Sequence, residues 1–111
     1  MRNDNEWLLD ILEAIERIEK YVSKGREAFE RDELIQNWIV NHLQIIGEAC
    51  HAISPDLRAK HPEILRSEMM GMRNILVHRY FGIDLEVVWH VAEFELPEMK
   101  RKFEAVVRDL K

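Results

Sequence analysis

Apolar side chains recur every three or four residues over two long stretches near the start of the chain, which is the spacing of one face of a helix. The spacing predicts a first helix over residues 5–24 and a second over residues 32–53. Asn3, Asp4 or Asn5 can cap the first helix, and Gly25 stands where its C-terminal cap belongs. The apolar stripe of the first helix consists of Leu8, Ile11, Leu12, Ile15, Ile18 and Val22.

The second predicted helix is apolar over more than one narrow stripe, so we expect it to be buried on two sides. Its remaining polar residues are spaced by four, three, four and three positions, which keeps them on one face. This polar strip consists of Asn37, Asn41, Gln44, Glu48 and His51. His42 lies near the apolar face and is interpreted as a packed, hydrogen-bonded residue, and Cys50 as buried filler.

The rest of the chain also has a helical pattern. Residues 54–62, "SPDLRAKHP", predict a short helical turn with Ser54 as the cap and Pro55 at the first position. A further apolar segment starts near residue 67, and Asp84 can cap a last helix that reaches about residue 109. Pro97 should kink that helix or break one of its hydrogen bonds. Since no segment alternates convincingly as a strand, we predict an all-α antiparallel bundle of four to five helices, in one domain over residues 1–111.

Composition narrows the class of protein. The chain has 111 residues and one cysteine, which excludes an internal disulfide and a multi-cysteine zinc site. It has no run of 18 apolar residues and begins with a polar, acidic stretch, so we expect a cytoplasmic protein without a membrane partner. His51, His61 and His90 have no carboxylate or cysteine spacing typical of a metal site, and we predict neither metal nor cofactor.

Charge is unevenly distributed along the chain. The net charge is −5, which argues against simple adhesion to nucleic acid or anionic lipid. Residues 66–80 carry three arginines and one glutamate, a net of +2, so the remainder carries −7. A locally positive segment on an acidic body favours a focused anion site over a broad nucleic-acid surface.

That segment contains "GMRNILVHRYFG", residues 71–82, with polar groups at both edges of an apolar run. Arg73 and His78 are five positions apart, which on an ideal helix separates them by about 140°. Two arrangements could bring them together. The helix could end near His78, so that His78 and Tyr80 turn back before Gly82, or two copies of the chain could share the site.

The chemistry of an arginine and a histidine suits RNA cleavage without a metal. Arginine offers a planar set of donors to phosphate oxygens and stays charged. Histidine titrates near neutral pH, so His78 could deprotonate a 2′-hydroxyl or protonate the leaving oxygen while Arg73 stabilises the pentavalent phosphate. Taken alone, the Arg73–His78 spacing is a weak pattern.

More of the chain resembles a known family. "GMRNILVHRYFGIDLEVVW" is similar to the signature of the HepT-like proteins of the HEPN superfamily, an arginine, four to six residues, a histidine, one residue and a tyrosine. "LLDILEAIERIEKYV", "QIIGEA" and "ISPDLRAKHPEI" resemble the same family in the same order. The resemblance covers nearly the whole chain.

The resemblance implies an all-helical, HEPN-like homodimer with two Arg/His motifs facing a common cleft. It implies a metal-independent RNase, the toxin of a toxin–antitoxin module, with Arg73 and His78 as catalytic residues. The partner would be an MntA-like nucleotidyltransferase antitoxin that attaches AMP to Tyr80. Asn74, the polar residue after the arginine, and Arg79 are the supporting residues that we predict within the motif.

Glu48 is predicted as a further supporting residue that lines the cleft and orients Arg73 or His78. The chain departs from the family pattern at Asn41, His42 and Gln44, and Arg79 stands where an acidic residue is frequent. Two other functions are open: a non-catalytic helical subunit that binds or presents substrate to a nucleotidyltransferase, and a nucleotide-sensing bundle in which Arg73 holds a phosphate.

Overall fold

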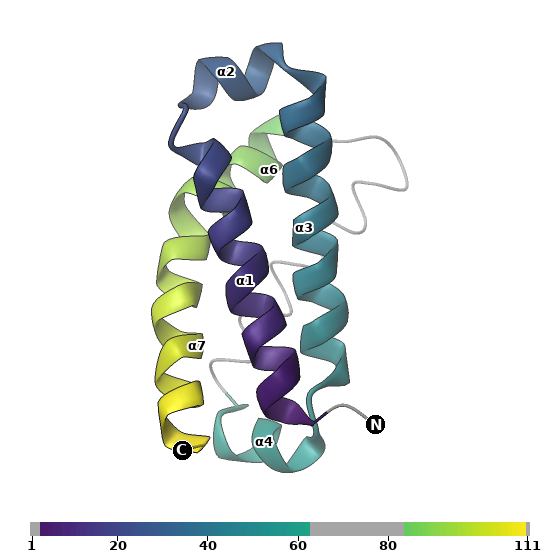
Figure 1. The fold of residues 1–111 in the computed structure, drawn as a ribbon, viewed down its shortest axis with the longest axis vertical. Coiled ribbons are helices and arrows are strands. Elements are labelled where there is room, and N and C mark those ends of the chain that lie inside the picture. The colour runs from purple at the N-terminus through teal and green to yellow at the C-terminus, as the bar shows by residue number, and fades with distance from the viewer. Residues whose placement is uncertain (1–2, 63–83, 111) are drawn as a thin grey trace.

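Three long helices lie side by side in the computed structural model, which describes residues 3–62 and 84–110. Helix α1, Asp4–Val22, runs away from the end that holds both termini, and helix α3, Glu33–Ala52, runs back beside it (Figure 1). Helix α7, Leu96–Leu110, is also antiparallel to α1, on the side away from α3. Both predicted N-terminal helices are confirmed to within about two residues.

Side-chain caps fix where the helices begin. Asn3 accepts the backbone N–H of Glu6 at the start of α1, and Asp32 accepts that of Leu34 at the start of α3. Helix α4, Pro55–Lys60, follows α3, and Ser54 caps it by accepting the N–H of Leu57, as predicted.

The lower end of the bundle is tied together across 50 positions of sequence. The Asp4 carboxylate accepts the backbone N–H of Ser54 at 2.8 Å and its hydroxyl at 2.5 Å. The Arg58 guanidinium donates to the carbonyls of Cys50 and His51, each at 2.8 Å, which satisfies the last turn of α3. The start of α1, the end of α3 and α4 therefore form one connected corner.

A short helix between α1 and α3 was not predicted. Helix α2, Arg26–Arg31, fills the connection with Phe29 as its buried residue. Gly25 was predicted as the C-terminal cap of α1, but the cap is Ser23. Gly25 instead links the two helices, with φ at 94° and ψ at 164°, a conformation that is essentially restricted to glycine.

The predicted last helix is helical throughout but changes type in the middle. Helix α6, Leu85–His90, is capped by Asp84 as predicted, and a π-helical segment, η1, Val91–Glu95, separates it from α7. Pro97 has no N–H, and its ring would collide with the carbonyl four residues earlier in a regular α-helix. The wider π turn directly before Pro97 is where the predicted disturbance occurs.

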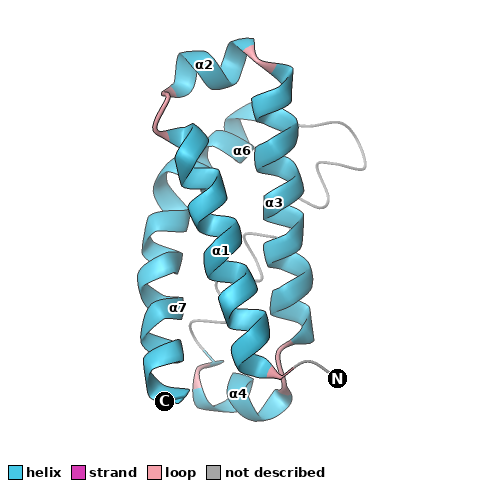
Figure 2. Ribbon diagram, viewed as in Figure 1, coloured by secondary structure: helices cyan, strands magenta, loops and turns pink. Residues whose placement is uncertain are grey.

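The core is formed by the facing stripes of α1, α3, η1 and α7, with Phe29 of α2 and Trp89 of α6 in contact at 5.2 Å between ring centroids. The described residues contain helices and connecting loops and no strand, which confirms the all-α prediction (Figure 2). Within the same residues no helix is long and apolar enough to cross a membrane. The predicted segment that starts near residue 67 lies outside the described residues.

Candidate functional site

Most of the predicted catalytic motif lies outside the described residues. This applies to Arg73, Asn74, His78, Arg79 and Tyr80. Glu48 is the predicted site residue that the structure places, and it lies on α3 with an exposed side chain. The geometry of the site therefore begins with the surface of α3.

The polar strip predicted on the second helix is found on the outer side of α3. Asn37, Asn41, Glu48 and His51 are exposed, and Gln44 is half-buried. The positions that point the other way, among them Ile39, Leu43 and Ile46, are buried in the core. Glu48 can thus meet another molecule or another part of the chain, and its supporting role stays a prediction.

A second group of residues lies at the edge of the strip, where α3 meets α1. His42 is 4% exposed, and its Nδ1 lies 2.7 Å from the carbonyl oxygen of Trp38, one helical turn earlier. The prediction of a packed, hydrogen-bonded histidine is confirmed. The Trp38 ring lies 4.4 Å from the His42 ring and 5.4 Å from the Tyr21 ring, between centroids.

Trp38 also joins the two helices. Its indole Nε1 donates to the backbone carbonyl of Arg17 on α1 at 3.1 Å, across 21 positions of sequence. Ring contacts with Tyr21 and His42 and a bonded N–H hold the indole in one orientation. This fixes the wall against which the His42 ring rests.

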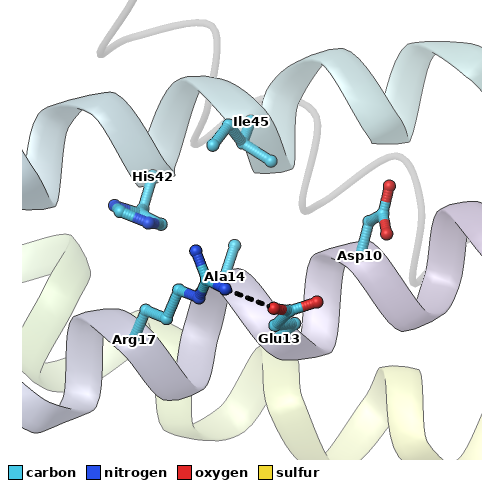
Figure 3. Close-up of a pocket in the computed structure, with 6 residues that line it drawn as sticks. All are labelled: Asp10, Glu13, Ala14, Arg17, His42 and Ile45. Carbon is cyan, nitrogen blue, oxygen red and sulfur yellow. Dashed lines mark hydrogen bonds and ion pairs between the residues drawn. The ribbon is translucent and has the colours of Figure 1, made fainter.

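Beside His42 a hollow of about 150 Å³ opens between α1 and α3. Figure 3 shows the residues of α1 on one side of it and those of α3 on the other. Arg17 extends into the gap and is held by Glu13, four residues earlier, at 2.6 Å. The lining consists of Asp10, Glu13, Ala14, Arg17, His42 and Ile45.

Sequence reasoning missed this hollow. The Glu13–Arg17 spacing identifies an ion pair along α1, but the position of His42 opposite that pair depends on how α1 and α3 pack. The departure from the family pattern at His42 was the signal in the sequence that could have drawn attention to this position.

Two other histidines of the described residues each lie near one carboxylate. His61 lies 3.9 Å from Asp109, and His90 lies 3.9 Å from Glu95. Within residues 3–62 and 84–110, no group of three histidine, cysteine or acidic side chains is arranged to hold a metal ion.

Among the described residues, Arg26 and Lys100 have raised pKa values, and neither is paired with a residue of the polar strip. A hydrogen bond from Arg26 to Glu30 raises the pKa of the guanidinium, with further attraction from Glu30 itself and from Glu86. On α7, the Glu19 carboxylate of α1 raises the pKa of Lys100. These pairs contribute to structure and do not belong to the candidate site.

Comparison with known proteins supplies the family. A probable ribonuclease HepT from Thermococcus cleftensis is 41% identical over 104 residues, which cover 93% of this chain and 94% of that protein. Two proteins from Methanocaldococcus jannaschii, whose names give them provisionally as RNases, are 38% and 37% identical over 110 residues. Those matches cover 98% of this chain and 91% and 95% of the relatives.

No solved structure matches the chain closely enough to add to the comparison. The model of the family described as Ribonuclease HepT-like matches residues 11–106, which include the whole Arg73–Tyr80 motif, the strip of α3 and most of α1 and α7. The chain belongs to the Ribonuclease HepT-like family.

Proposed function

We infer that this chain is a metal-independent endoribonuclease and the toxin component of a toxin–antitoxin module. The observation that carries the proposal is the family match over residues 11–106, since it contains Arg73 and His78 at the spacing of the motif. The names of the relatives, which refer to ribonucleases, support the same activity.

The two motif side chains divide the work of cleavage. His78 removes the proton of a 2′-hydroxyl, whose oxygen then attacks the adjacent phosphorus, and the bond from phosphorus to the 5′-oxygen breaks as that oxygen takes up a proton from water. Arg73 donates to the phosphate oxygens, on which negative charge accumulates in the pentavalent transition state. Neither role requires a metal ion.

The site is proposed to lie in a cleft between two copies of the chain. A homodimer with a two-fold axis brings two Arg73–His78 pairs to one groove. Asn74 and Arg79 lie next to the catalytic residues in the sequence and support them, and Glu48, exposed on α3, orients Arg73 or His78. Arg79 adds a positive charge beside the substrate phosphate.

The test of the proposal is His78→Ala. Loss of the general base should lower RNA cleavage by about 10²–10⁴-fold and abolish growth arrest on expression, while the dimer persists. His90→Ala is the matched control, because His90 is an exposed histidine on α6 outside the motif and should keep full activity. Unchanged toxicity of His78→Ala would favour a non-catalytic subunit that binds or presents substrate to a nucleotidyltransferase.

Regulation is proposed to act at Tyr80. An MntA-like nucleotidyltransferase partner transfers AMP from ATP to the phenolic oxygen and releases pyrophosphate. The added group places a bulky anion two residues from His78, where it excludes the RNA phosphate by occupancy and repulsion.

Co-expression with that partner tests the modification. The intact mass of the chain should increase by one or more AMP units, and Tyr80→Phe should abolish the increase. Tyr21→Phe, which changes a half-buried tyrosine of α1, is the control and should still be modified. An adduct that persists on Tyr80→Phe would place the acceptor at another residue.

A further inference from the structure

The hollow between α1 and α3 is lined by His42, one of whose ring nitrogens is hydrogen-bonded within the fold. A carbonyl oxygen can accept a hydrogen bond but cannot donate one, so the contact with Trp38 requires the proton of the neutral His42 ring to be on Nδ1. Nε2 is then an acceptor. The His42 residue is 4% exposed, and its ring packs at a tilt against the Trp38 ring.

The opposite wall of the hollow offers donors. The Arg17 guanidinium has five N–H groups in a planar set, and Glu13 accepts from Nη2 alone. The hydrogen bond to Glu13 orients the guanidinium plane of Arg17, because it fixes the Nη2 side of the guanidinium along α1. Arg17 can therefore donate to a second planar group that enters between the helices.

Charge decides which kind of ligand the hollow favours. The carboxylates of Asp10 and Glu13 line the hollow beside the Arg17 guanidinium. A phosphate would be repelled by the Glu13 carboxylate and would find Arg17 already paired with it. A neutral group that carries both N–H donors and acceptors is favoured instead.

Size and the apolar lining narrow the class further. A volume of about 150 Å³ matches that of cavities that hold one small aromatic ring. Ala14 and Ile45 supply apolar contact for the faces of such a ring, while the polar groups meet its edge. A nucleobase combines a flat ring with donors and acceptors on its edge.

We propose that the hollow between α1 and α3 binds one unpaired nucleobase of the RNA. The identification of the ligand as RNA rests on the proposed function. Arg17 donates to acceptors on the edge of the base, and His42 Nε2 accepts one of its N–H groups. This makes Arg17 and His42 residues that select substrate, since a base stacked within a duplex cannot enter the hollow, whereas an unstacked one can.

The test follows the imidazole nitrogens of His42 by NMR in the full-length protein. Guanosine is the probe, because arginine pairs well with the acceptors of guanine and the nucleoside carries no phosphate. Guanosine should shift the Nε2 signal of His42, and inorganic phosphate should not. A shift with phosphate alone, or with neither compound, would overturn the proposal.

Two variants examine the contacts directly. Arg17→Ala and His42→Asn should each weaken guanosine binding by about tenfold or more, as expected for loss of a hydrogen bond to a buried partner. Asparagine retains a donor toward the Trp38 carbonyl and lacks the Nε2 acceptor. Arg101→Ala, an exposed arginine on α7, is the matched control and should leave binding unchanged.

The inference can be separated from the proposed function. Guanosine binding is measured without RNA cleavage. If His78→Ala stayed active and contradicted the ribonuclease proposal, the guanosine result would still stand on its own. If RNA is cleaved but Arg17→Ala binds guanosine as tightly as the native chain, the hollow is not a base site. Ile45→Trp is the substitute variant if His42→Asn does not fold. Ile45 is 37% exposed at the rim of the hollow, so a tryptophan there should fill the hollow and abolish the shift of the His42 signal by guanosine.

Discussion

Lys100 and Glu19 illustrate how single residues connect the helices of this bundle. The ammonium of Lys100 on α7 lies 3.0 Å from a carboxylate oxygen of Glu19 on α1, and the two side chains are 28% and 42% exposed. The interaction raises the pKa of Lys100 above its ordinary value of 10.5. Because the folded pKa is the higher one, the stabilisation is complete below the unfolded pKa and disappears as the pH rises through the folded pKa.

Lys100→Met should therefore have a pH-dependent cost. At pH 7 the variant should lose between a few tenths and about 1 kcal/mol of unfolding free energy, the range of a partly exposed ion pair. At a pH above the raised folded pKa of Lys100 the difference from the native chain should shrink toward zero, because the native lysine has then lost its proton. Urea unfolding at both pH values measures the difference in unfolding free energy, and a difference that is the same at both would contradict the stabilising role of the Lys100–Glu19 pair. Arg101→Met is the control, because arginine keeps its charge over this pH range.

At this scale the sequence identified helix caps and local pairs well, and contacts across helices poorly. Ser54 and Asp84 cap the helices that they were expected to cap, and Asn3 is the one of three candidates that caps the first helix, because a cap depends on the next three residues. The packed state of His42 was also predictable from its place on α3. The bond from Trp38 to Arg17 was not, since it depends on packing between residues 21 positions apart.

Among the elements, short helices and changes of helix type were the least predictable. Helix α2 has six residues and buries Phe29 alone, so it has no apolar stripe to recognise. The segment from residue 84 was predicted as one helix, and its periodicity is indeed helical throughout. The π turn at Val91–Glu95 is a response to Pro97 whose form depends on how α6 and α7 pack.

Gly25 gives the connection between α1 and α2 a measurable property. A side chain added at its Cβ would meet nothing within 4 Å, so steric collision is not an issue. The cost of Gly25→Ala is therefore backbone strain at φ 94°, and we expect about 1–3 kcal/mol of lost stability.

Thermal and urea unfolding of Gly25→Ala measure that strain. Lys24→Ala, at the preceding exposed position without a positive φ, is the control and should stay within about 0.5 kcal/mol of the native chain. A Gly25→Ala variant as stable as the native chain would mean that α1 and α2 are joined by a different backbone conformation.

At the scale of the whole molecule, α1 packs between α3 and α7 and buries its apolar face in the core. Helix α3 retains an exposed polar strip and several exposed apolar side chains, among them Leu34, Trp38 and Ile45. The all-α architecture followed from the helical periods of the sequence. The prediction that two copies share a site rests on the resemblance and on the separation of Arg73 and His78 by about 140° on an ideal helix. The packing of a single chain contains no information about the surface of a second copy.

Mixed dimers test whether the site is built from two chains. Arg73→Ala and His78→Ala should each be inactive alone. If Arg73 of one copy acts with His78 of the other, refolding the two variants together at equal amounts should restore about a quarter of native cleavage. Half of the dimers are then mixed, and each mixed dimer holds one intact pair and one doubly altered pair.

If both residues of a pair come from one chain, no dimer contains an intact pair and cleavage stays at the level of the single variants. Activity assayed after native mass spectrometry has established that mixed dimers form distinguishes the two arrangements.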